Sequence, residues 1–344
     1  MILAQFLEYL ESGERDPEEI TFMEPQAGGA CRAGNIYNLL QRVLYRMVEQ
    51  GQLEYAQIPV ISLNLMGEEK HTGFRITPSL LSGGIAAGCY GDLIMCLYQQ
   101  VKPYEQNPGE TDRIRSQVEK KLCESIRRHR NGRHTREKNY RYACEVFSKV
   151  PVKPGKKKRV GITGEIYMKY SKLGNDDIES FLLRQGMEPY SGGFVNYCLY
   201  LVDTERYKAE KYQHNPIMAK ACAFVLHRLC EAQKHLLTVI GETDRFQTDL
   251  PFPELKEKVQ GILAEGCNTG DGWLIAAEVI QYVEKGCGSV LILHPFGCLV
   301  SHVCERGILQ RLHARFPDVS IQTIEYDYDQ SKTLRESRIL LAIS

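Results

Sequence analysis

The sequence has no excess of charge of either sign, because its 43 basic residues are matched by 43 acidic residues. A chain of this kind exerts no general attraction on nucleic acid or on anionic membranes, so we expect neither as a partner. The N-terminal residues 1–5 also lack the basic segment and the cleavage site of a secretory signal peptide, and Glu8 and Glu11 follow soon after. These absences favour a cytoplasmic protein.

Several short motifs are missing as well. Neither GxxxxGK[ST] nor GxGxxG occurs, so the chain carries no common nucleotide-binding motif. No two cysteines have the CxxC spacing that marks many metal and redox sites, and no repeat of short period is visible. A metal or redox site in this chain therefore has to be assembled from cysteines that lie far apart in the sequence.

Cysteine itself is abundant, with 12 residues spread widely over 344. Disulfide scaffolds are typical of small secreted domains, and this chain is long enough to bury a full core or two. We therefore expect reduced thiols in a cytoplasm. Such thiols are available for metal or redox chemistry, although free cysteine is also a common small core residue.

Residues 80–97, LLSGGIAAGCYGDLIMCL, form the one stretch with the length and apolar character of a membrane span. Asp92 lies inside it, and four glycines weaken it as a helix. A buried or subunit-contacting helix that packs through small residues is the preferred interpretation, with Cys89 and Cys96 as core residues on one face.

Apolar periodicity predicts a βαβ unit near the N-terminus. Its elements are a strand at 20–23, a helix at 36–49 and a strand at 58–63, preceded by a short amphipathic helix at 2–10 and followed by a mostly helical region at 77–146. The segment VPVKPGKKKRVGITGEIY then forms a linker that leads into a new strand at 160–163.

Beyond the linker the alternation of strands and helices resumes, which predicts a second parallel sheet with both faces covered. The expected elements are helices at 176–185, 255–265, 273–284, 298–315 and 331–343, a helical stretch at 194–239, and strands at 290–293 and 319–324. We predict two domains: a first α/β domain with a helical extension at 1–152 and a second α/β domain with a helical insertion at 153–344.

Three loops place a cysteine among glycines beside a helix start. They are GGACRAGN with Cys31, EGCNTGDGW with Cys267 and HPFGCLVSH with Cys298. Glycines let backbone N–H groups approach closely, and the start of a helix favours an anion such as a thiolate. Iron–sulfur clusters use the same surroundings, because their sulfurs accept backbone hydrogen bonds. Cys298 follows an apolar strand, which is where ligands bind in α/β sheets.

Other uses of these residues stay open. Cys298 and His302 are four residues apart, so a helix would align them for zinc, with Cys31 or Cys267 completing the site. A cysteine hydrolase is conceivable, but nothing in the sequence singles out its base. Each cysteine taken alone is more often structural than a ligand.

The motifs together carry a family resemblance. The segments are GGACRAGNIYNLLQ, IPVISLN, VGITGEIYMKY, GCNTGDGWLIAAEVI, HPFGCLVSHV and DVSIQTIEYDYDQSKTLRESRI. In this order they resemble the C-terminal module of the acyl-CoA dehydratase activase-related proteins, which are relatives of the 2-hydroxyacyl-CoA dehydratase subunits and of the double-cubane cluster proteins. The resemblance extends from about residue 20 to residue 344.

The resemblance implies an α/β fold with two Rossmann- or flavodoxin-like parallel-sheet domains and additional helical segments. It also implies an iron–sulfur cluster, of the 4Fe-4S type or related, in the cleft between them. Cys31 and Cys298 would then be cluster ligands that share this cleft, and Cys267 is the third candidate. In the family, a separate ATP-hydrolysing activator drives low-potential electrons into the cluster for a reductive or dehydration reaction on a CoA thioester.

The chain also departs from the family pattern. Long family members carry an ATPase domain and another cysteine-bearing module upstream, and neither occurs here. We therefore expect the activator to be a separate partner, and a companion dehydratase-like subunit or an upstream module to complete the assembly. Two alternatives remain, namely a cluster-free scaffold whose cysteines only pack and a zinc-binding protein.

Overall fold

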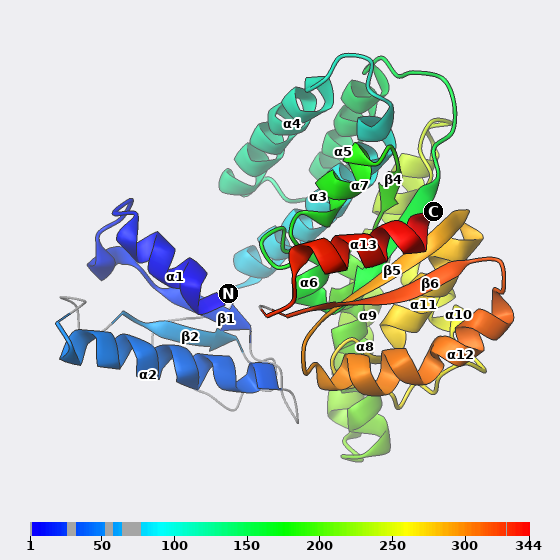
Figure 1. Cartoon of the computed structure of the whole chain (residues 1–344). Coiled ribbons are helices and arrows are strands. Elements are labelled where there is room, and N and C mark those ends of the chain that lie inside the picture. The colour runs from blue at the N-terminus through cyan, green and yellow to red at the C-terminus, as the bar shows by residue number, and fades with distance from the viewer. Residues whose placement is uncertain (1, 26–31, 52–57, 64–76, 328) are drawn as a thin grey trace. The chain divides into compact units, whose positions relative to one another are not determined.

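The computed structural model describes residues 2–25, 32–51, 58–63, 77–327 and 329–344. The chain is a mixed α/β protein with two small parallel sheets (Figure 1). It divides into two compact units: unit 1 comprises residues 1–75 and 297–299, and unit 2 comprises residues 76–296 and 300–344. Residues 76–152, which the sequence predicts as a helical extension of the first domain, thus cluster with unit 2.

Unit 1 contains the predicted βαβ unit. Its elements are α1 (Ile2–Glu11), the short helices η1 (Pro17–Glu19) and η2 (Arg32–Asn35), β1 (Phe22–Pro25), α2 (Ile36–Glu49) and β2 (Val60–Leu63). The two strands are parallel, with Phe22 opposite Val60. Leu40 and Leu44 of α2 are buried against them, and the ring of Phe6 from α1 stacks on Phe22 at 4.3 Å between centroids. The apolar stripes of α1 and α2 therefore cover this small sheet.

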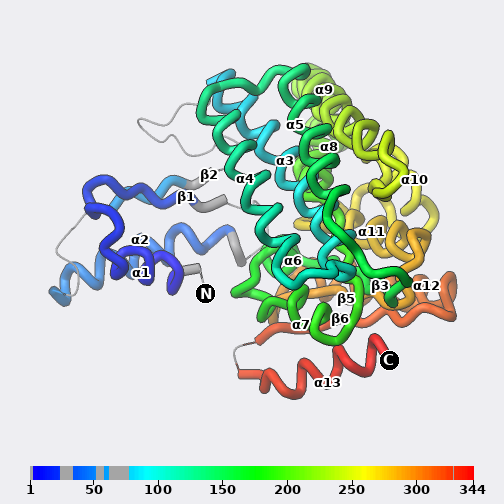
Figure 2. The backbone as a smooth tube through the Cα atoms, turned by 90° about the horizontal axis from the view of Figure 1, so that it is seen from above, coloured from blue at the N-terminus to red at the C-terminus, as the bar shows by residue number. Residues whose placement is uncertain are grey.

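Unit 2 begins with a layer of long helices. They are α3 (Pro78–Val101), α4 (Glu110–Arg127), α5 (Arg133–Ser148), α8 (Phe194–Lys211) and α9 (Pro216–Gly241), with the short helix η3 (Lys102–Tyr104) after α3. Helix α3 contacts α4, α5, α8 and α9, and α5 contacts α9 (Figure 2). The mostly helical character expected for residues 77–146 is confirmed.

The sheet of unit 2 has four parallel strands in the order β4-β3-β5-β6. The strands are β3 (Arg159–Gly164), β4 (Glu188–Tyr190), β5 (Cys287–Pro295) and β6 (Ser320–Tyr326). The remaining helices are α6 (Ile166–Tyr170), α7 (Ile178–Arg184), α10 (Phe252–Lys258), α11 (Gly272–Glu284), a π-helical turn at Ser301–Glu305, α12 (Arg306–Arg315) and α13 (Lys332–Ile343). Strands β3, β5 and β6 were expected from the sequence, and β4 was not.

Both faces of this sheet are covered. Alternate residues of β5 point to opposite sides, so that Leu291 and Leu293 pack in the cluster that includes Ile339 of α13, while Val290 and Ile292 pack in the cluster that includes α11. Figure 1 shows α13, in red, crossing one face. This double coverage explains why β5 reads as a continuous apolar run without alternation.

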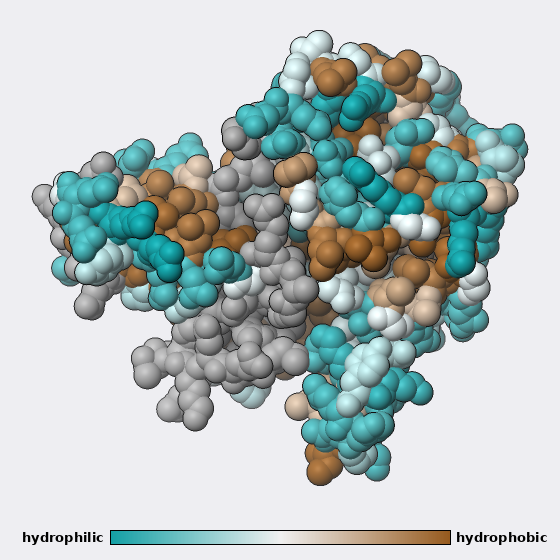
Figure 3. Space-filling model, turned by 60° about the horizontal axis from the view of Figure 1, so that its bottom comes forward, coloured by the Kyte–Doolittle hydropathy of each residue, from teal (hydrophilic) through white to brown (hydrophobic). Residues whose placement is uncertain are grey.

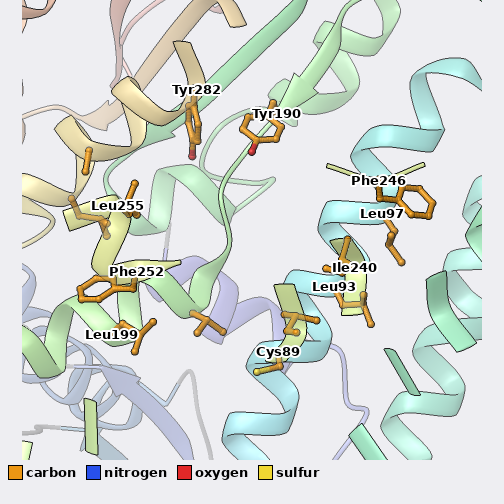
Figure 4. Close-up of a cluster of buried hydrophobic side chains, with 14 of the residues drawn as sticks. Cys89, Leu93, Leu97, Tyr190, Leu199, Ile240, Phe246, Phe252, Leu255 and Tyr282 are labelled. Atoms are coloured by element: carbon orange, nitrogen blue, oxygen red, sulfur yellow. The ribbon is translucent and has the colours of Figure 1, made fainter. Parts of the chain in front are cut away.

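The larger core of unit 2 joins the helical layer to the sheet (Figure 4). It includes Cys89, Leu93 and Leu97 from α3, Ile240 from α9 and Tyr282 from α11, all nearly inaccessible to solvent. The interpretation of Cys89 as a core residue is therefore confirmed. Cys96 packs against the same cluster and its Sγ donates to the carbonyl of Gln247 at 3.4 Å.

Helix α3 explains the apolar stretch noted in the sequence. Among the described residues, one helical segment, Pro78–Tyr104, is long and apolar enough to cross a membrane. Its acid, Asp92, accepts the backbone N–H groups of Phe194 at 2.7 Å and Val195 at 2.9 Å and thereby caps the start of α8. Gly193 is required beside it, because a Cβ there would lie 2.3 Å from Oδ2 of Asp92. We therefore interpret α3 as a core helix of unit 2.

Candidate functional site at the carboxyl edge of the four-stranded sheet

The strand order of unit 2 singles out one position at the edge of the sheet. The chain passes from β3 outward to β4 and then crosses to β5 on the other side of β3. The connections after β3 and β5 therefore diverge, and ligands of open parallel sheets bind outside the carboxyl ends of such strands. The residues that follow β3 begin with Glu165, and those that follow β5 lead through a turn to Cys298.

The end of β3 lies very close to β5. Gly164 has φ of +130°, and a Cβ built on it would lie 2.0 Å from the carbonyl oxygen of Leu293. The N–H of Glu165 donates to this same carbonyl at 2.8 Å. Only glycine fits this close approach, so the TGE sequence after β3 fixes where the side chain of Glu165 begins.

Three carboxyl groups, those of Glu165, Asp271 and Glu305, lie close enough in this region to influence one another, and none of them forms an ion pair among the described residues. Glu165 accepts the N–H of Met168 at 3.0 Å and so caps α6. Glu305, at the end of the π-helical turn, is fully buried, and its Oε1 accepts the hydroxyl of Ser301 at 2.7 Å. Oε2 of Glu305 has no hydrogen-bond partner among the described residues. Asp271, in the loop before α11, is also buried.

Burial governs the ionisation of these groups. It raises the pKa of Glu305 to about 8, and the charge of Glu165 adds to this effect. It raises the pKa of Asp271 well above its ordinary range, with further contributions from Glu165, Glu305 and Glu278. The pKa of Glu165 is raised for the same reason, against the hydrogen bonds that its carboxylate accepts. Glu305 therefore carries a proton over much of the neutral range.

A buried ion pair lies beneath this edge. Nζ of Lys169, on α6, lies 2.8 Å and 2.9 Å from the two carboxylate oxygens of Glu278 on α11. The hydroxyl of Thr163, the penultimate residue of β3, donates to the same carboxylate at 2.5 Å. The pair thus joins the strand end, the helix that follows it and the helix that covers the sheet.

Two histidines and one arginine lie near the carboxylate of Glu325 at the ends of β5 and β6. Nδ1 of His294 lies 3.9 Å, Nε2 of His302 lies 3.5 Å and Nη2 of Arg306 lies 3.2 Å from Oε2 of Glu325. Burial lowers the pKa of His294, whose Nε2 has no hydrogen-bond partner among the described residues. His302 thus faces a carboxylate of β6, and the helix after Cys298 begins with a π-helical turn, which differs from the regular α-helical spacing on which the zinc hypothesis depends.

The loop that carries Cys267 is defined by close backbone packing. The carbonyl of Cys267 accepts the N–H of Trp273 at 2.9 Å, and a Cβ on Gly272 would lie 2.2 Å from that carbonyl oxygen. A Cβ on Gly270 would lie 2.5 Å from a methyl group of Val300. The loop of Cys267 therefore packs against the first turn of the helix that follows the HPFGC segment, within unit 2.

The three predicted cysteine ligands stand as follows. Cys31 lies outside the described residues. Cys267 is half-buried in unit 2, and Cys298 is half-buried in residues 297–299, which cluster with unit 1. Within the described ranges, no three histidine, cysteine, aspartate or glutamate side chains are close enough to hold a metal ion. These residues alone do not assemble a complete set of ligands, so no geometry of a metal centre follows from them.

Several of the other described cysteines are deeply buried, and Cys89, Cys144 and Cys287 form no disulfide among the described residues. Burial raises the pKa of Cys89 and of Cys144 to about 11 and that of Cys287 to about 12. A thiol that stays protonated is a poor metal ligand and a poor nucleophile. These buried thiols are therefore structural.

A pocket of about 250 Å³ lies between α3, α4 and residues 169–179 of unit 2. Arg115 pairs with Glu119 at 2.7 Å and Lys172 with Asp177 at 3.5 Å, while Lys169 pairs with Glu278 of α11. The pocket is lined by no cysteine or histidine. Most of its charged groups are therefore already neutralised by a partner.

Sequence reasoning missed the buried carboxyl groups and the cluster around Glu325. The signal that could have found Glu165 is an acid placed directly after an apolar strand and a glycine, in VGITGE. Searches against protein-family models, curated proteins and solved structures gave no match for this chain.

Proposed function

We propose that this chain is an iron–sulfur redox component of the kind found in 2-hydroxyacyl-CoA dehydratases. In this proposal it receives low-potential electrons from a separate ATP-hydrolysing activator and supports a reductive or dehydration reaction on a CoA thioester. The proposal rests on the family resemblance of the sequence motifs and on one structural observation: the packing of Gly270 against Val300, which brings the Cys267 loop to the helix that follows Cys298.

The residues proposed as ligands are Cys31, Cys267 and Cys298. The position of Cys298 in the chain supports its assignment as a ligand, because it follows β5, one of the two strands whose connections diverge. The neighbouring glycines support the assignment of Cys267 as a ligand, because Gly266 and Gly270 let backbone N–H groups approach an anionic sulfur. When bound, a cluster of this type supplies an electron at low potential, and three protein thiolates would leave one iron open to a substrate.

We also propose that unit 2 belongs to the Rossmann- or flavodoxin-like class and that unit 1 contributes a second α/β domain. The order β4-β3-β5-β6 supports the first part, since it matches the first four strands of a flavodoxin-like sheet. The parallel βαβ arrangement of β1, α2 and β2 supports the second. The boundary near residue 152 and the shared cleft between domains remain predictions from the sequence.

The proposed partners follow from the same reasoning. A companion dehydratase-like subunit or an upstream module completes the assembly, and the activator supplies the energy that this chain has no nucleotide motif to supply. The proposed setting is the cytoplasm, where thiols stay reduced. Neither nucleic acid nor a membrane takes part.

Serine variants of single cysteines test the assignment. The chain and its Cys31→Ser, Cys267→Ser and Cys298→Ser variants are reconstituted anaerobically and assayed for iron, zinc and the charge-transfer absorption of the product. Cys123→Ser is the matched control, since Cys123 lies exposed on α4. We expect each of the three variants to lose iron and absorption while the control keeps both.

Other outcomes decide between the alternatives. If Cys267→Ser keeps full iron while the other two lose it, the three-cysteine set is wrong. Stoichiometric zinc in place of iron would support a zinc protein. A chain that takes up neither metal would support the cluster-free scaffold.

A further inference from the structure

Helices α8 and α9 form a hairpin that extends beyond α12 in Figure 1. The N-terminal part of α9 carries apolar side chains on two opposite faces, one packed on the core and one exposed. Ala219 is buried, and Leu226, Leu229 and Cys230 pack toward the core of unit 2. The residues on the opposite face of the same helix are exposed among the described residues.

That opposite face carries large apolar side chains. Ile217 is 82% exposed and Phe224 is 68% exposed, and Met218 and Val225 are also largely accessible. Ile217, Ala221, Phe224 and Arg228 follow each other at intervals of four, three and four residues, so they form one stripe along the helix. The stripe spans about 16 Å at the helical rise of about 1.5 Å per residue. Figure 3 shows apolar surface, in brown, at the free end of this projection.

Most of the charged side chains near the stripe are basic. Lys211, Lys220 and Arg228 take part in no ion pair among the described residues. By contrast, Arg206 and Lys208, farther down α8, are both paired with acids at 2.9 Å. Helix α9 carries three exposed basic residues, Lys220, Arg228 and Lys234, and one acid, Glu231, so its net charge is positive.

We propose that this stripe, Ile217–Ala221–Phe224–Arg228 with Lys220 at its edge, is a docking surface for an amphipathic acidic helix of a partner protein. Apolar side chains of the partner would pack between Ile217 and Phe224 as a third helix beside α8 and α9. Its carboxylates would pair with Lys220 and Arg228. Contiguous exposed apolar surface with a charged border is typical of protein interaction sites.

The hairpin contacts the loop of Cys267 near its turn, at the C-terminal end of α8. The hydroxyl groups of Tyr207 and Tyr212 lie 3.2 Å and 3.5 Å from the position that a Cβ on Gly266 would take. Gly266 precedes Cys267. A helix bound on the stripe would therefore lie on the same hairpin that contacts the Cys267 loop, whether or not that loop binds a metal.

A peptide pair tests the proposal with the full chain. The probes are two fluorescein-labelled synthetic helices of about four turns, identical except that one has leucine and glutamate and the other leucine and lysine at the amphipathic positions. We expect saturable anisotropy binding of the glutamate peptide that weakens with salt, and at least tenfold weaker binding by Phe224→Ser. The variant Lys220→Glu/Arg228→Glu should prefer the lysine peptide. Leu341→Ser, at a site 79% exposed on α13, is the matched control and should bind as the unmodified chain does.

Each other result overturns the proposal. Absence of saturable binding, or equal binding by Phe224→Ser, removes the docking surface. Sedimentation with phosphatidylcholine–phosphatidylserine vesicles that requires Phe224, without peptide binding, assigns the stripe to a lipid surface. A concentration-dependent dimer that Phe224→Ser abolishes assigns it to a second copy of this chain. Thermal unfolding of all variants shows that they are folded.

Discussion

The buried pair of Lys169 and Glu278 gives the sharpest stability prediction. Both side chains are 3% exposed, and the ammonium group contacts both carboxylate oxygens. The substitution Lys169→Met keeps most of the apolar stem and removes the charge. Glu278 is then left as a buried carboxylate with only the hydroxyl of Thr163 as a partner.

The expected cost is large because the remaining charge is not compensated. Removing one partner of a buried pair typically destabilises a protein by about 3–5 kcal/mol. The double variant Lys169→Met/Glu278→Gln should recover most of this loss, because the neutral amide can still accept from Thr163. Trp273 is the single tryptophan of the chain and is buried near the start of α11. Its fluorescence during urea unfolding at neutral pH therefore reports on unit 2 directly.

An exposed pair of similar geometry serves as the control. Lys149 lies 2.5 Å from Glu145 on α5, with both side chains more than half exposed. Lys149→Met should cost about 0–1 kcal/mol, as surface pairs do. The reasoning is refuted if Lys169→Met costs no more than Lys149→Met, or if the double variant is less stable than Lys169→Met.

Three further predictions concern the sheet edge and the helical layer. Because the pKa of Glu305 is raised from 4.5 to about 8, its stabilising contribution is complete below about pH 4.5 and is lost as the pH rises through 8. Glu305→Gln should therefore flatten the fall of stability by about 1.4 kcal/mol per pH unit in this range, and parallel curves for the two proteins would contradict it. Asp92→Ala removes the cap of α8 and should lower stability by about 1–2 kcal/mol, measured by urea unfolding, whereas an unchanged midpoint would show that the cap contributes nothing. Gly164→Ala places a methyl group against the backbone of Leu293 and should give a poorly folded chain by circular dichroism, and a native thermal transition would mean that the close approach is absent.

Much of the fold could be predicted from the sequence because its signals are local. The helix α11 begins at Gly272 where the sequence predicts Trp273, and β5 contains the predicted strand at 290–293. Strand β4 was missed because it has three residues, one of them Pro189, and lies at the edge of the sheet, where proline is tolerated. Helix α10 ends at Lys258, not at 265 as predicted, because Gly261 adopts a left-handed backbone with φ of +79° and stops the chain from continuing.

The candidate site was less predictable because its parts come from distant segments. Glu165, Asp271 and Glu305 lie on three different loops and turns, and nothing in the sequence around each one indicates that their side chains share a buried region. The glycine at 270 is recognisable as a loop residue, but its contact with Val300 depends on how α11 and the helix after β5 pack on the sheet. Local patterns predict the elements, and the site depends on their packing.

The iron and acid-labile sulfide content of the chain after anaerobic purification tests the central proposal most directly. We expect a brown protein with iron and sulfide in comparable amounts, charge-transfer absorption that bleaches on reduction, and an electron paramagnetic resonance signal of the reduced cluster. A colourless, folded chain that takes up neither iron nor sulfide during anaerobic reconstitution would contradict the proposal.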